Sequence, residues 1–122
     1  MKTITYTIPG SIRSKKNSKR IIHVGTCSKL IPSKAYLDWE KQARAAMWVQ
    51  KADPDLPLIC LVHVEAHFFF RGPQPDLSGC LESIADCLEG ILWADDRQIE
   101  SWDGSRLHHD LNNPRTEVTV RW

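Results

Sequence analysis

The feature that most constrains the fold is the stretch 58–70, the longest run of predominantly apolar residues in the chain. It is rich in β-branched and aromatic side chains, which favour a long and largely buried β-strand. His63, Glu65 and His67 interrupt it at every second position, so all three share one face of that strand. We expect this face to be the less buried side of a sheet. A membrane helix needs about 20 apolar residues, and these interruptions exclude one here.

The size and composition of the chain predict one globular domain over residues 1–122, because 42% of the residues are hydrophobic and 25% are charged. The first residues lack the apolar segment of a signal peptide, so the sequence predicts a cytoplasmic protein without membrane association. The four cysteines include no Cys-x-x-Cys pair, so the sequence has no zinc-binding pattern. We expect them to be reduced thiols. No small-molecule cofactor is expected either.

Hydrophobic periodicity predicts elements in the order β, β, α, β, α, β, β. The strands are expected over 2–8, as a short strand or hairpin after a basic loop within 11–28, over 58–70, around 98–102, and at the C-terminal end. Ser33 is the expected cap of a first helix with the apolar stripe Tyr36, Trp39, Ala43 and Met47. A second helix is expected over about 77–89 and ends at Gly90. This order predicts an α+β fold, with a mixed β-sheet and two main helices on one face.

Charge is distributed unevenly along the chain. Residues 1–50 carry a net charge of +8 and residues 51–104 a net charge of −8, whereas the whole chain carries only +1. Such asymmetry suggests a polyanionic partner for the basic half and a cationic one for the acidic half. The simpler explanation is that the two halves attract each other within the fold, and charge alone does not separate these readings.

Carboxylates gather on and around the second predicted helix. Its apolar face is expected to hold Leu77, Leu81, Ile84 and Leu88, and its polar face Ser78, Glu82, Asp86 and Glu89. The remaining acidic residues of interest flank the helix and are Asp76, Asp95 and Asp96. Oxygen ligands without nearby histidine or cysteine suit Mg²⁺ or Mn²⁺, which can assist phosphodiester hydrolysis. On spacing alone, an interpretation without a metal is favoured. In it Asp76 only caps the helix, the helix carboxylates form a solvated face, and Asp95 and Asp96 belong to an ordinary turn.

Three motifs in this region resemble the RusA family of Holliday junction resolvases. They are PDLSG at 75–79, ADCL at 85–88 and DDRQI at 95–99, and the family pattern is Pro-Asp-x-Asp-Asn-x-x-Lys, Asp-x-Leu and Asp-Asp-x-Gln-Ile. The resemblance covers nearly the full chain. It implies a RusA-like homodimeric endonuclease that binds branched DNA and nicks four-way junctions symmetrically with Mg²⁺, or with Mn²⁺ as a substitute.

The resemblance also implies roles for individual residues. Asp76 and Asp96 match the first and last catalytic aspartates, and the expected metal ligands are Asp76, Asp86, Asp95 and Asp96. The basic stretch is expected to contact DNA phosphates through Arg13, Lys15, Lys16, Lys19 and Arg20.

Two departures from the family pattern bear on catalysis. Ser78 and Gly79 stand where the family has its second aspartate and an asparagine, and Glu82 stands where it has a lysine. Either Glu82 replaces the missing carboxylate as a catalytic residue, or the protein binds branched DNA without cleaving it. A third hypothesis is an interaction module whose acidic half docks a basic protein, which would leave the basic stretch without a role.

Overall fold

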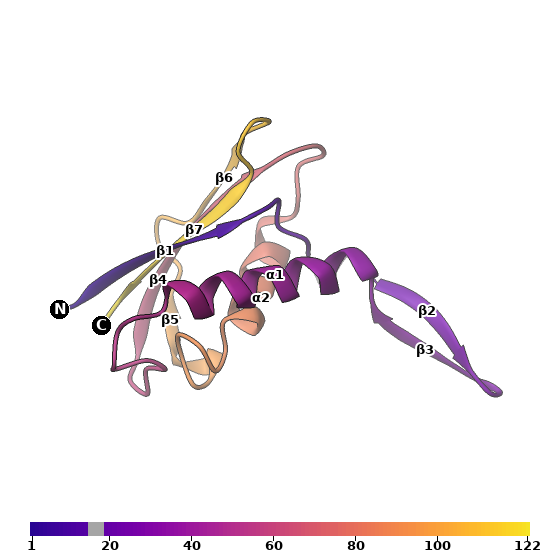
Figure 1. The fold of residues 1–122 in the computed structure, drawn as a ribbon, viewed down its shortest axis with the longest axis horizontal. Helices are drawn as coiled ribbons and strands as arrows, with labels where there is room; N and C mark the ends of the chain where they lie inside the picture. Colours follow the sequence, from indigo (N-terminus) through magenta and orange to yellow (C-terminus); the bar gives the residue numbers. More distant parts are fainter. Residues whose placement is uncertain (15–18) are drawn as a thin grey trace.

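The computed structural model describes residues 1–14 and 19–122, and Figure 1 shows its fold. Five strands form one mixed sheet, two strands form a separate hairpin, and the helices lie against the sheet. The strands are β1 (Thr3–Pro9), β2 (Lys19–Val24), β3 (Cys27–Pro32), β4 (Val62–Phe70), β5 (Ile99–Ser101), β6 (Arg106–His109) and β7 (Arg115–Arg121). The helices are α1 (Lys34–Gln50), α2 (Leu77–Cys87) and the short 3-10 helix η1 (Asp96–Gln98). The predicted α+β class is confirmed.

Strand β4 is the centre of the sheet. It pairs antiparallel with β7 on one side and parallel with β5 and β6 on the other, while β1 pairs antiparallel with β7. Its residues alternate between buried and half-buried positions, so the face carrying His63, Glu65 and His67 is the less buried one, as predicted. The buried face of β4 and the corresponding residues of β1 and β7 form the core against the helices.

The strand begins at Val62 and not at residue 58 as the sequence predicted. Leu58 instead forms an isolated bridge to Trp93, with hydrogen bonds from Leu58 N to Leu92 O and from Ala94 N to Leu58 O. This segment therefore pairs with the chain that follows α2, an interaction that apolar composition alone does not reveal.

Helix α1 forms as predicted. Ser33 caps it by accepting a hydrogen bond from Tyr36 N at 3.1 Å, and the whole predicted stripe is buried, as Tyr36, Trp39, Ala43 and Met47. Such an apolar stripe at helical spacing is what fixes the helix against the sheet.

Helix α2 ends at Cys87, two residues before the predicted end, and Ile84 and Leu88 of its predicted apolar face are buried as expected. Its buried residues are Gly79, Cys80, Ser83, Ile84 and Cys87, whereas Leu77 and Leu81 are only half-buried. Small side chains allow the helix to approach its neighbours closely, and burial of small residues is not visible in a pattern of large apolar ones.

The cysteines are free thiols in the described structure, as predicted. Burial raises the pKa of both Cys80 and Cys87 to about 12, so these thiols stay protonated and unreactive. Neither helix of the described chain is long and apolar enough to cross a membrane.

Candidate functional site

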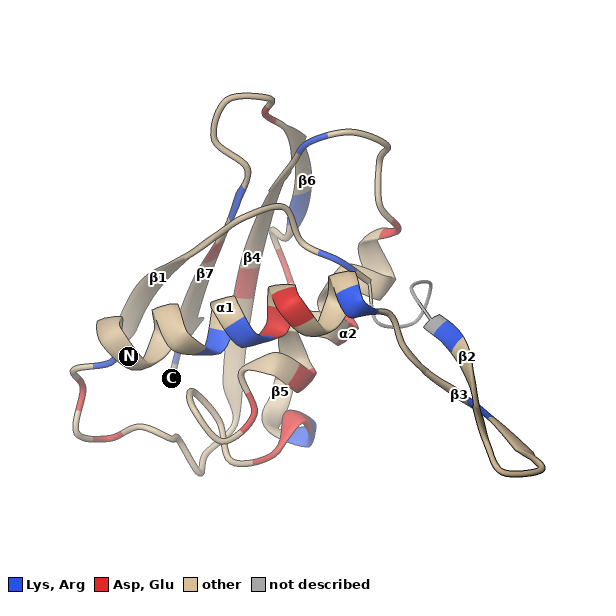
Figure 2. Cartoon of the chain, turned by 45° about the vertical axis from the view of Figure 1, so that its right-hand side comes forward, with Lys and Arg blue, Asp and Glu red and all other residues tan. Residues whose placement is uncertain are grey.

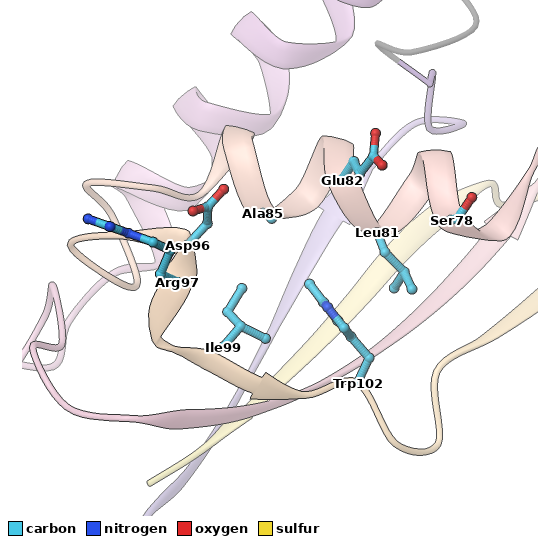
Figure 3. A pocket seen from close by; sticks show the side chains of 8 residues that line it. All are labelled: Ser78, Leu81, Glu82, Ala85, Asp96, Arg97, Ile99 and Trp102. Carbon is cyan, nitrogen blue, oxygen red and sulfur yellow. The ribbon is translucent and has the colours of Figure 1, made fainter.

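A groove runs along the exposed side of α2 and is closed on its other side by η1 and β5 (Figure 3). It has a volume of about 440 Å³, and we refer to it as the α2 groove. Its lining residues are Ser78, Leu81, Glu82, Ala85, Asp96, Arg97, Ile99 and Trp102. The floor is therefore apolar, and the polar groups lie along its rim and at its ends.

The helical repeat explains the order of these groups. Ser78, Glu82 and Asp86 are spaced four residues apart, so they lie one above another on the exposed face of α2, as predicted. Leu81 and Ala85 are half-buried and face the groove with Ile99 and Trp102 of the following segment (Figure 3).

Three carboxylates converge at the C-terminal end of the α2 groove. One ligand oxygen from each of Glu89, Asp95 and Asp96 lies within 4.8 Å of the others, and we call this group the acidic cluster. The Asp96 backbone N donates to Glu89 Oε1 at 3.0 Å, which joins the end of α2 to the start of η1. The cluster is thus built by the turn through Gly90 that returns the chain to its own helix.

The DDRQI motif holds this turn in place. Asp95 caps η1 by accepting a hydrogen bond from Arg97 N, and the Gln98 side-chain oxygen accepts one from Asp95 N at 2.8 Å. The Gln98 amide also donates to the carbonyls of Leu58 and Cys60, both at 2.8 Å. Gln98 therefore anchors the acidic cluster to the segment that leads into β4.

The carboxylates of the acidic cluster differ in their electrostatic surroundings. The pKa of Asp96 is raised above its usual value, first by loss of solvent and then by the charges of Glu89, Asp95 and Asp86. The pKa of Asp95 is lowered to about 2, because Arg97 donates to it from the side chain and the backbone. Asp96 therefore carries the unrelieved repulsion of the cluster, and a cation bound there would remove it.

Asp76 lies at the opposite end of α2, where it is the N-cap residue. The Ser78 hydroxyl donates to Asp76 Oδ2 at 3.0 Å. Ten residues of helix correspond to an axial rise of about 15 Å, so positions 76 and 86 are well separated along the groove. The structure brings Asp95 and Asp96 together with Glu89, and the charge of Asp86 reaches Asp96 and raises its pKa after the larger effects of burial, Glu89 and Asp95. It places Asp76 beside Ser78 and leaves Glu82 between the two ends of the groove.

The basic stretch approaches the site at the N-terminal end of α2. Arg13 lines a second cavity together with Arg71 and Pro75, immediately before Asp76. A Cβ at Gly79 would overlap the Ser14 hydroxyl, so glycine in place of the family asparagine allows this close approach. Arg20 lies exposed on β2. Lys15 and Lys16 lie outside the described residues, and of Lys19 only the backbone in β2 is described.

The sequence analysis did not identify four residues of the site and its surroundings. Glu89 was expected only as part of a solvated helix face, although it follows Asp86 by three residues and precedes the Gly90 turn. Arg97 and Trp102 line the groove because η1, β5 and the residue that follows β5 lie beside α2. Arg71, which shares the second cavity with Arg13, was likewise not singled out.

Comparison with known families gives one match. The model described as endodeoxyribonuclease RusA matches residues 9–121. Among curated proteins, none matches the chain. The matched region includes the whole α2 groove, the acidic cluster and the strands that support them. The chain therefore belongs to the RusA endodeoxyribonuclease family.

Proposed function

We propose that this protein is a metal-dependent endonuclease that resolves four-way (Holliday) DNA junctions by paired symmetric nicks. Family membership supports endonuclease activity on branched DNA. The observation that carries metal dependence is the acidic cluster, in which oxygens of Glu89, Asp95 and Asp96 lie within 4.8 Å of one another.

The donor set of the acidic cluster fits Mg²⁺, with Mn²⁺ as a substitute. Every ligand atom is a carboxylate oxygen, which hard divalent cations prefer. Asp96, Glu89 and Asp95 would hold the ion because their oxygens converge, and Asp86 would add its charge nearby. Burial and the neighbouring carboxylates raise the pKa of Asp96, and a bound cation would offset both effects. When bound, the ion would activate water and neutralise charge on the phosphoryl oxygens.

The residues at the other end of the α2 groove would complete the site. Asp76 matches the first family aspartate, and the Ser78 hydroxyl holds the Asp76 carboxylate through its 3.0 Å hydrogen bond. Glu82 lines the groove between this pair and Asp96, so it can supply a carboxylate in place of the missing family aspartate. We assign catalytic roles to Asp76, Glu82 and Asp96 in this rearranged site.

The basic stretch would position the DNA. Arg13 and Arg71 line the same cavity next to the start of α2. There they can neutralise phosphates of a strand that enters the groove. A homodimer with twofold symmetry would present two such grooves to the two equivalent strands of a junction.

A second candidate function is binding of branched DNA without cleavage. It is favoured by Glu82, which replaces a cation able to stabilise phosphoryl charge with a group that repels it. In this case the basic stretch keeps its role, whereas the acidic cluster has no catalytic one.

The test is cleavage of a mobile four-way DNA junction with Mg²⁺ or Mn²⁺. We expect paired nicks from the wild type, and binding without cleavage from Asp76→Asn, Glu82→Ala and Asp96→Asn. Asp38→Asn is the matched control, because Asp38 is an exposed carboxylate on α1 outside the groove, and it should cut like the wild type. A wild type that binds the junction but does not cut it with either metal would refute the nuclease and leave the binding protein.

A further inference from the structure

The β2–β3 hairpin extends away from the rest of the domain (Figure 1). Its large aliphatic side chains are exposed: Ile21 by 66%, Val24 by 54% and Leu30 by 64%. A two-stranded hairpin without further packing is marginally stable in water. Such a segment is expected to be covered by a partner when the protein is at work.

The register gives the hairpin two different faces. Directly paired residues of an antiparallel ribbon point to the same side. Ile21 pairs with Leu30 on one side, where the neighbouring pair His23 and Ser28 is joined by a 3.0 Å hydrogen bond. We call this side the aliphatic face.

The opposite side of the hairpin carries its described cationic side chains. Arg20 pairs with Ile31, and Lys29 pairs with Ile22. We call this side the basic face. The basic face also carries Ile22 and Ile31, which are half-buried, and the exposed Val24. Arg20 and Lys29 therefore lie on the side of the hairpin opposite to Ile21 and Leu30.

The charge of this part of the chain indicates the partner. The first acidic residue of the sequence is Asp38, so residues 1–37 contain eight Lys and Arg residues and no carboxylate side chain. Figure 2 shows blue positions and no red ones on β2 and β3. Two such hairpins would repel each other, which disfavours a second copy of the chain as the occupant. A polyanion complements this surface, and phosphate neutralisation is the main source of affinity for DNA.

We propose that the hairpin enters the branch point of a DNA junction, with its basic face along the phosphates and Ile21 and Leu30 against an unstacked base pair. This inference rests on the proposed function and adds the source of its structural selectivity. Aliphatic side chains are known to wedge between base steps, at a cost of a few kcal/mol for unstacking in a continuous duplex. At a branch point stacking is already interrupted, so the same insertion is favoured there.

The experiment compares a four-way junction with a linear duplex of the same length, using the full chain. The junction carries 2-aminopurine beside the branch point, whose fluorescence rises when its stacking is disturbed. We expect wild-type protein to raise the fluorescence. The double variant Ile21→Ser/Leu30→Ser should leave it unchanged and bind the junction about tenfold more weakly, as expected for the loss of one apolar contact to a base. Affinity for the linear duplex should stay within about twofold, because phosphate contacts carry no information about branching.

Two further variants separate the contributions. Ile59→Ser is the matched control, because Ile59 is 88% exposed and lies outside the hairpin, and it should behave as the wild type. Lys29→Ala should weaken binding to both DNAs alike and reduce the salt dependence by the equivalent of about one phosphate contact. Equal thermal midpoints of all variants would show that folding is unchanged.

The inference is overturned if the double variant keeps both the fluorescence change and the preference for the junction. It is also overturned if the double substitution dissociates a dimer in sedimentation, since the hairpin would then cover a second copy. In either case wild-type cleavage of the junction leaves the proposed function intact. A wild type that binds junction and linear duplex equally, and cuts neither, refutes the proposed function together with this inference.

Discussion

The α2 groove and the β2–β3 hairpin both carry charged side chains, but only the groove rests on fully buried residues. The acidic cluster flanks the segment Ile91, Leu92 and Trp93, whose side chains are fully buried, and Gln98 hydrogen-bonds to the segment that leads into β4. The hairpin has no comparable support, and Ile21 and Leu30 remain about two-thirds exposed.

This difference matches the role that we propose for each region. Catalytic carboxylates need to be held within a fraction of an ångström, so they belong on elements fixed by a packed core. A DNA-binding arm has to adapt to its substrate, and it can acquire its order on binding. The hairpin joins the rest of the domain at Ser33, between the end of β3 and the start of α1.

The largest loss of stability is expected when a residue that supports the α2 groove is truncated. Trp93 is fully buried, and its Nε1 donates to Ala85 O at 3.1 Å in the last turn of α2. We expect Trp93→Ala to lower the free energy of unfolding by about 3–5 kcal/mol through loss of packing. Leu30→Ala in the hairpin should change it by less than about 0.5 kcal/mol, as is usual for surface substitutions. Urea denaturation measures both, and equal losses would contradict the distinction between a supported and an unsupported region.

An intermediate loss of stability is expected at Ser33, where the hairpin joins α1. Ser33→Ala removes the hydrogen bond to Tyr36 N and should cost about 1 kcal/mol in the free energy of unfolding. Ser33→Asp retains a capping acceptor and serves as the control, with stability close to that of the wild type. A loss of the same size in Ser33→Asp would show that the cap is not what Ser33 contributes.

The smallest change in the free energy of unfolding should be a gain in stability. Asp96→Asn removes repulsion from Glu89, Asp95 and Asp86, so it should stabilise the metal-free protein by about 0.3 kcal/mol at neutral pH. The raised pKa of Asp96 means that the folded state binds its proton more tightly than the unfolded state. The penalty is therefore absent below the usual carboxyl pKa and appears as the pH rises through the raised pKa.

Thermal unfolding at pH 3 and pH 7 checks this expectation. The gain from Asp96→Asn should be present at pH 7 and absent at pH 3. Added Mg²⁺ should stabilise the wild type more than the variant, because the variant lacks a ligand. A gain of equal size at both pH values would show that charge repulsion is not its cause.

Local patterns predicted most of the elements correctly. The apolar stripe of α1 and the alternation of β4 arise because each element packs one face against the core. Residues close together in the sequence specify that face. The prediction was wrong where burial depended on partners. Residues 58–61 were apolar enough for a strand but pair with the segment around Trp93, and α2 buries Cys80 and Ser83 in place of Leu77 and Leu81.

The open face of the sheet illustrates the same limit. His63, Glu65 and His67 share that face, as their spacing predicts. The structure adds His108 of β6, whose Nε2 lies 2.9 Å from His67 Nδ1, while His67 Nε2 lies 2.7 Å from Glu65 Oε2. The parallel pairing of β4 with β6 creates this contact, and parallel neighbours joined by long connections leave no local mark in a sequence.

The sequence by itself determined the α+β class, the two amphipathic faces of β4, the cap of α1 and the family motifs around α2. These properties depend on neighbours within a few residues, which the order of side chains specifies directly. Only the tertiary structure decided that Glu89 joins Asp95 and Asp96, that Asp76 lies at the far end of the groove, and that the hairpin extends alone. These depend on how the turn at Gly90 and the connections between strands return the chain through space, and many long-range contacts decide that return together.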